Sequence, residues 1–118
     1  MSNFKFGNFE TEFDPTDVTF VEKYEMAAEN YQNKIKDLPT DGKASDTMKT
    51  VCKIFFETFD GIFGTGASKQ MFGKTQSVDL CINAFKTLIK MMNDYSETLK
   101  AFATAGVNRK TRRASKKG

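Results

Sequence analysis

The sequence predicts a mainly α protein: an N-terminal β-hairpin, a three-helix domain with a short extra helical turn, and a disordered basic C-terminal tail. Phe alternates with polar residues near the start, and apolar residues recur every three or four positions over three later stretches. The last eleven residues carry six positive charges and almost no apolar surface, so they cannot order themselves by burial. We therefore expect residues 1–106 to form a hairpin plus helical binding domain and residues 107–118 to form a flexible tail.

Residues 3–13 have the pattern of a β-hairpin. The alternation is centred on Gly7-Asn8, a two-residue turn in which Gly accepts a positive φ at the first position. This register places Phe6 opposite Phe9 and Lys5 opposite Glu10. One face then carries Phe4, Phe6, Phe9, Thr11 and Phe13. Because a two-stranded ribbon is marginal in water, we expect this face to lie on the helices or on another chain.

Two helices follow the hairpin. Residues 14–17 end the second strand and cap the first helix, which has apolar positions from Phe20 to Leu38 and stops before Pro39. After a polar turn, Ser45 or Asp46 caps a second helix over residues 47–63. The apolar stripe of this second helix is too wide for one buried face.

A glycine-rich segment separates the second helix from the third. Gly64 is placed to end the second helix in the left-handed region, and residues 67–72 can form one short helical turn. Ser77 caps a third helix of about 26 residues, which closes near Gly106. The Gly-Thr-Gly motif does not predict a phosphate-binding loop, because it follows a helix and lacks a Lys-Ser or Lys-Thr ending.

Charge and cysteine content separate the body from the tail. Residues 1–107 hold all fifteen acidic residues and twelve of the eighteen basic ones, a net charge of −3. Every Arg lies in the tail, and Arg grips carboxylates in a bidentate manner, so Arg109, Arg112 and Arg113 are candidates for contacts with an acidic partner. Cys52 and Cys81 lie in apolar patterns outside any CxxC pair, which predicts buried free thiols in a reducing compartment.

The residue inventory argues against catalysis and membrane insertion. The chain has no His, and its carboxylates lie on a solvated helix flank or at turns and caps, so we expect no enzyme, catalytic residue, cofactor or metal site. No stretch approaches the roughly 20 apolar residues of a membrane-spanning helix, and the start lacks the apolar run of a signal peptide. We expect a cytoplasmic protein that does not contact a membrane.

The apolar content favours a binding role. Twelve Phe and six Met in 118 residues exceed what three helices and a hairpin are expected to hide. The surplus predicts self-association or a groove for an amphipathic helix of a partner. The candidates for that partner surface are Phe55, Phe56, Phe59, Phe63, Met71 and Phe72.

Three segments resemble a known family. They read FDPTDVTFVEKYE at residues 13–25, FFETFDGIFGTGASKQMFG at 55–73 and NRKTRR at 108–113, and they are similar to the tail assembly chaperones of long-tailed bacteriophages and prophages. The resemblance implies a protein of the host cytoplasm that transiently coats the helical, apolar tape measure protein, in many copies arranged head to tail, until tail-tube subunits displace it. It also implies a longer frameshifted product that binds tail-tube protein, with Lys116-Lys117 as a possible slippage point.

Two other functions compete with this interpretation. The basic tail could neutralise nucleic-acid phosphates, although the body is acidic and the tail has no interleaved aromatic residues for base stacking. A virion role, as a head–tail connector or tail completion protein, is compatible with the same composition. Binding of DNA or RNA that is lost when residues 108–118 are removed would favour the nucleic-acid function over the chaperone function.

Overall fold

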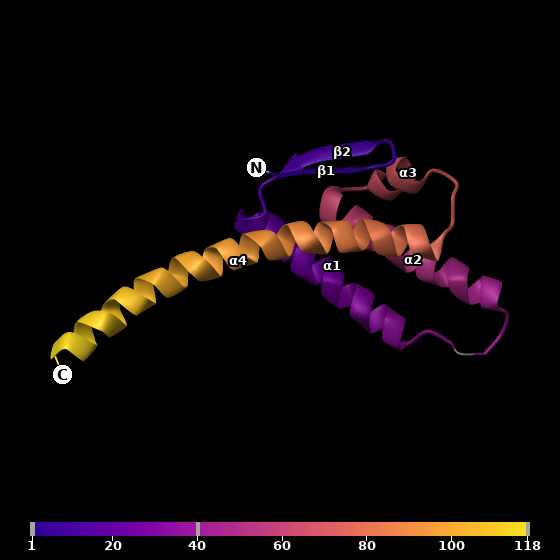
Figure 1. The fold of residues 1–118 in the computed structure, drawn as a ribbon. Helices are drawn as coiled ribbons and strands as arrows, with labels where there is room; N and C mark the ends of the chain where they lie inside the picture. Colours follow the sequence, from indigo (N-terminus) through magenta and orange to yellow (C-terminus); the bar gives the residue numbers. More distant parts are fainter. Residues whose placement is uncertain (1, 40, 118) are drawn as a thin grey trace.

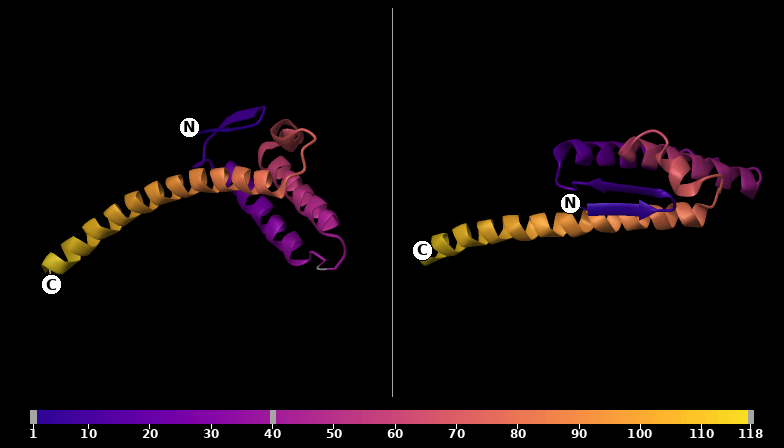
Figure 2. Two further views of the ribbon diagram at one scale, coloured as in Figure 1. Left: turned by 45° about the vertical axis from the view of Figure 1, so that its right-hand side comes forward. Right: turned by 90° about the horizontal axis from the view of Figure 1, so that it is seen from above.

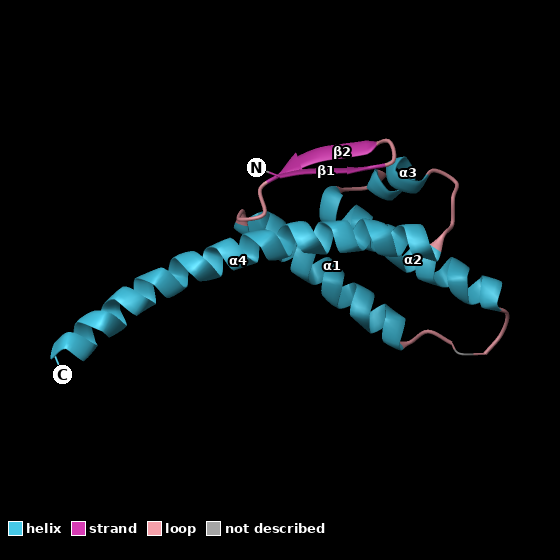
Figure 3. Cartoon of the chain, viewed as in Figure 1, coloured by secondary structure: helices cyan, strands magenta, loops and turns pink. Residues whose placement is uncertain are grey.

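The computed structural model describes the backbone of residues 2–39 and 41–117, and side chains of residues 2–39, 41–97 and 99–101. A β-hairpin precedes a set of helices, so the predicted mainly α fold with an N-terminal hairpin is confirmed (Figure 3). The elements are β1 (Ser2–Phe6), β2 (Phe9–Phe13), α1 (Val18–Lys36), α2 (Ala44–Phe63), α3 (Ala67–Phe72) and α4 (Val78–Lys117).

The helices form a crossed arrangement that the hairpin closes (Figures 1 and 2). α1 and α2 run antiparallel, and α4 crosses this pair before it continues beyond the rest of the molecule. The β-hairpin and α3 lie together along one edge, next to both α4 and α2. The long end of α4 gives the molecule extents of 67 × 33 × 21 Å.

The hairpin has the predicted register and lies on its own helices. Phe6 pairs with Phe9 and Lys5 with Glu10, as expected from the alternation. Gly7 has a φ of +60°, and a Cβ there would stand 2.2 Å from the Met71 carbonyl oxygen. The backbone N–H of Asn8 donates to the carbonyl oxygen of Gln70 over 3.2 Å. The turn is therefore anchored directly to α3, and only glycine fits at its first position.

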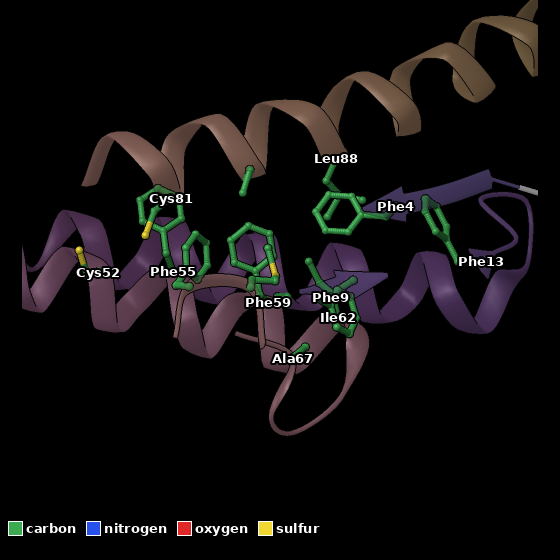
Figure 4. Close-up of a cluster of buried hydrophobic side chains, with 14 residues drawn as sticks. Phe4, Phe9, Phe13, Cys52, Phe55, Phe59, Ile62, Ala67, Cys81 and Leu88 are labelled. Atoms are coloured by element: carbon green, nitrogen blue, oxygen red, sulfur yellow. The ribbon is translucent and has the colours of Figure 1, made fainter. Parts of the chain in front are cut away.

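Phenyl rings from every layer meet in the core (Figure 4). Phe4 is fully buried and stacks on Phe63 at 5.0 Å between ring centroids, while Phe6 approaches Phe72 at 5.3 Å. Phe13 stacks on Phe20 of α1 at 4.7 Å. These offset and tilted ring pairs each add about 0.5–1.5 kcal/mol beyond simple burial. The apolar face of the hairpin thus becomes a wall of the core.

Two boundary predictions need correction. α2 begins at Ala44, three residues before the expected start, with Lys43 rather than Ser45 or Asp46 at the N-cap. Asp46 instead lies in the first turn, where its negative charge interacts favourably with the positive end of the helix dipole. Gly64 does end α2, but with φ 110° and ψ 157° it lies outside the left-handed helical region predicted for it. The Ser77 cap is confirmed by a hydrogen bond from the Leu80 N–H to the Ser77 hydroxyl oxygen, 3.3 Å long.

The end of α4 also differs from the expectation. The sequence predicts a helix that closes near residue 106 and a flexible tail after it, whereas the helical backbone continues to Lys117. The physical reason is the absence of a helix-breaking residue after Gly106, since Arg, Lys and Ala have high helix propensity. The expected domain boundary at residue 107 therefore falls inside a continuous helix.

Candidate partner-binding surface

The residues predicted to form the partner surface lie in the core. Phe55, Phe59, Met71 and Phe72 are buried, and Phe56 and Phe63 are half-buried and pack against them. The hairpin and α4 cover the extra apolar face of α2, so the buried members of this set contact their own chain rather than forming an open surface. No Phe with a described side chain is exposed. An acidic substitution of Phe55 or Phe59 would consequently test folding rather than partner binding.

An exposed apolar groove follows the seam between α1 and α2. Its lining includes Met26, Ala27 and Tyr31 from α1 and Ile54 and Gly61 from α2. A second hollow shares Ile54 and extends the groove to Leu38 and Pro39 at the end of α1. We call the two hollows together the α1–α2 groove; their lining follows α2 from Thr50 to Gly61, about 17 Å at 1.5 Å per residue, and both hollows share Lys34 and Glu57, which pair across the seam.

Small residues bring the two helices of the groove close together. A Cβ added at Gly61 would lie 3.7 Å from the Ala27 Cβ, which is ordinary van der Waals contact. Met26 forms an exposed edge of the groove, with 67% of its surface accessible. The ring of Tyr31 packs on Phe55 at 4.9 Å, and partial burial raises its pKa above the usual value. The groove thus has a fixed aromatic wall and a flexible thioether edge.

Charged side chains border the groove. Lys34 of α1 forms an ion pair with Glu57 of α2 across the seam, and both side chains are about half exposed. Lys23 and Lys53 add positive charge at the two ends, and Asp37 adds negative charge. The hollows have volumes of about 150 and 280 Å³, below the roughly 300–1,000 Å³ of typical small-molecule sites. An open, shallow groove with mixed charges at its rim suits a peptide or helix better than a metabolite.

A third hollow lies where α4 leaves the body. It has a volume of about 260 Å³ and is lined by Val21, Tyr24 and Glu25 of α1 and by Met92 and Leu99 of α4, among others. Leu99 is 53% exposed, and burial raises the pKa of the Tyr24 hydroxyl. We call this hollow the arm root and residues 95–117 of α4 the arm. The predicted contact residues Arg109, Arg112 and Arg113 lie on the helical backbone of the arm, but their side chains lie outside the described set.

The two cysteines are buried and free, as predicted. Burial, with a further contribution from the neighbouring Cys52, raises the pKa of the Cys81 thiol to about 12. A thiol held neutral in this way is a poor nucleophile. Among the described residues there is no cluster of His, Cys, Asp or Glu side chains that could hold a metal ion, and no helix long and apolar enough to cross a membrane.

The sequence matches a known protein family. One family model matches residues 7–116. The chain belongs to family DUF6673. DUF6673 is described as a family of unknown function, so membership assigns no activity. No curated protein and no solved structure matches the chain.

Sequence reasoning missed the α1–α2 groove. Met26 was the available signal, because it is an apolar residue at a position of α1 where charged side chains dominate. Ala27 and Gly61 gave no separate signal, since small residues also fit a buried helix crossing. The groove therefore emerges only when both helices are placed side by side.

Proposed function

We propose that this DUF6673 protein is a tail assembly chaperone of a long-tailed bacteriophage or prophage. In this role it transiently coats helical apolar segments of the tape measure protein and keeps them soluble until tail-tube subunits displace it. The α1–α2 groove is the observation that carries the proposal, because exposed Met26 there borders a surface seam between two long helices that is also lined by Tyr31 and Gly61. The similarity of residues 13–25 and 55–73 to that family supplies the partner.

The groove matches one face of an amphipathic helix. A length of about 17 Å corresponds to about three helical turns, so side chains at positions i, i+3, i+4 and i+7 of the partner would lie along Met26, Tyr31 and Gly61. Met26 can adjust its rotamer to different apolar side chains, which suits a partner with many non-identical segments. Lys23 and Lys53, at the two ends of the groove, can pair with carboxylates that flank the apolar stripe.

The small size of the groove suits a transient coat. A surface this short gives modest affinity for each copy, and many copies along one rod provide the total coverage. Tail-tube subunits can then displace the copies one at a time. A longer frameshifted product that contacts tail-tube protein is part of the same proposal, and the role requires no catalytic step.

Co-expression of a tape measure segment with full-length protein tests the proposal. We expect the segment to become soluble with the wild-type protein, and its soluble fraction to fall at least several-fold with Met26→Asp. Met48→Asp is the matched control, because Met48 is also exposed, at 55%, but does not line the groove. Equal effects of the two substitutions, or no effect of either with both proteins folded, would contradict the proposed site.

Nucleic-acid binding is the second candidate function. The observation that favours it is the continuous helix that carries six basic residues away from an acidic body. Fluorescence anisotropy with labelled DNA and RNA at about 0.15 M salt tests it, with a variant truncated after residue 107 as the control. Binding by the full chain that disappears on truncation would favour this function over the chaperone role.

A further inference from the structure

The apolar stripe of α4 continues past the body of the protein. Phe85, Leu88, Met92, Tyr95 and Leu99 follow one another at alternating spacings of three and four residues, which is the repeat of a coiled-coil seam. Leu88 is buried in the core, whereas Leu99 is 53% exposed. Phe102 continues the same repeat in the sequence. The seam that packs within the body thus extends onto the arm, where Leu99 lines the arm root and stays about half exposed.

The charges near the arm root are opposite to those of the arm. Exposed carboxylates follow one line along the first turns of α1, those of Glu22, Glu25 and Glu29, and Asp14 and Asp17 are exposed just before the helix. Val18 adds an exposed apolar side chain to this line, while Lys23 lines the α1–α2 groove instead. The arm ends in six basic residues within residues 108–118. A surface with apolar and acidic groups therefore lies beside the base of an apolar and basic helix.

We propose that the arm of one copy docks at the arm root of a second copy, so that two chains form an antiparallel pair. Parallel arms would place two groups of six positive charges side by side, within the Debye length of about 10 Å at 0.1 M salt. Antiparallel arms instead bring each basic end toward Glu22 and Glu25 of the other copy. The occupant of the arm root is thus a second copy of this chain.

The dimensions of the arm fit this arrangement. The helix from Leu99 to Lys117 is about 27 Å long, and α1 from Val18 to Glu29 spans about 17 Å. An arm whose Leu99 lies at the arm root of the other copy is therefore long enough for its helical backbone to follow the acidic line. Because the contact is reciprocal, the pair is isologous and closes at two copies. The inference goes beyond the proposed function and does not depend on a tape measure partner.

Sedimentation equilibrium of the full chain tests the pair. We expect a mass of twice the 13.3 kDa chain at about 0.1 M salt, and partial dissociation at about 0.5 M salt. Leu99→Asp should yield monomers. The double variant Glu22→Lys/Glu25→Lys should raise the dissociation constant at least about tenfold, because both carboxylates face the basic end of the other arm. Asp41→Lys/Asp46→Lys is the matched control, since it changes the charge equally near the α1–α2 turn, at the opposite end of the molecule.

A charge-swap variant makes the test specific for arm and root. Arg112→Glu/Arg113→Glu should weaken the pair, and its combination with Glu22→Lys/Glu25→Lys should restore it. Circular dichroism verifies that each variant is folded. A wild-type chain that stays at 13.3 kDa at about 100 µM, a mass that grows beyond two copies, or a folded charge swap that fails to restore the pair would overturn the inference.

Discussion

Truncation of Phe4 should destabilise the protein more than any other single change in the hairpin. Its ring is fully buried and contacts Phe9, Phe59 and Phe63 at centroid distances of 5.0–6.5 Å. Removal of a ring in such a site costs about 3–5 kcal/mol, from lost burial and the cavity left behind. With a urea m-value of about 2 kcal/mol/M, Phe4→Ala should lower the unfolding midpoint by about 2 M.

Phe6→Ala is the internal comparison for this experiment. Phe6 lies on the same strand and the same face, but it is half-buried and contacts Phe72 at 5.3 Å. We expect Phe6→Ala to lower the free energy of unfolding by about 1.5 kcal/mol, which corresponds to a shift of the urea midpoint below about 1 M. Urea titrations followed by circular dichroism measure both shifts. If Phe4→Ala unfolds the chain outright, Phe4→Leu provides a smaller change at the same site. A cost at Phe4 no larger than that at Phe6 would refute the docking of the hairpin on its own helices.

Three further predictions concern the turn, the thiols and the rim of the groove. Gly7→Ala should lower the free energy of unfolding by at least about 2 kcal/mol more than Gly42→Ala, because both glycines have positive φ but only Gly7 faces a backbone oxygen. Urea titrations of the two variants measure this difference. The pKa of the Cys81 thiol is higher in the folded than in the unfolded protein, so its contribution to the stability of the fold is complete below a pH of about 9 and is lost as the pH rises toward about 12. Over this pH range the urea midpoint of Cys81→Ala should therefore fall less than that of the wild-type protein. A double-mutant cycle on the exposed Lys34–Glu57 pair should give a coupling below about 1 kcal/mol, and a larger value would mean that the pair is shielded from solvent.

Local patterns in the sequence were sufficient to predict the elements of the fold. The alternation around Gly7-Asn8 predicts the strand register, because side-chain direction in a hairpin depends only on the turn and the period of two. Pro39 and Ser77 likewise predict the end of α1 and the start of α4. These signals act within a few residues of one another, so no tertiary information is needed to interpret them.

The partner surface could not be predicted in the same way. The width of the apolar stripe on α2 indicates how much of that helix is buried, but not whether the covering group is a partner or the chain itself. The hairpin packs on Phe59 and Phe63, which uses the surface that the sequence assigns to a partner. The α1–α2 groove depends on the approach of Ala27 to Gly61, a contact between residues far apart in the chain.

Methionine methyl NMR tests the central claim, that the α1–α2 groove rather than the phenyl-rich core contacts the partner. With the chain labelled at its Met methyl groups, a helical peptide from a tape measure protein is added in steps. We predict that the Met26 signal shifts or broadens, while the signals of exposed Met48 and buried Met71 remain unchanged. A shift confined to Met71, or equal shifts at Met26 and Met48, would contradict the groove as the binding surface.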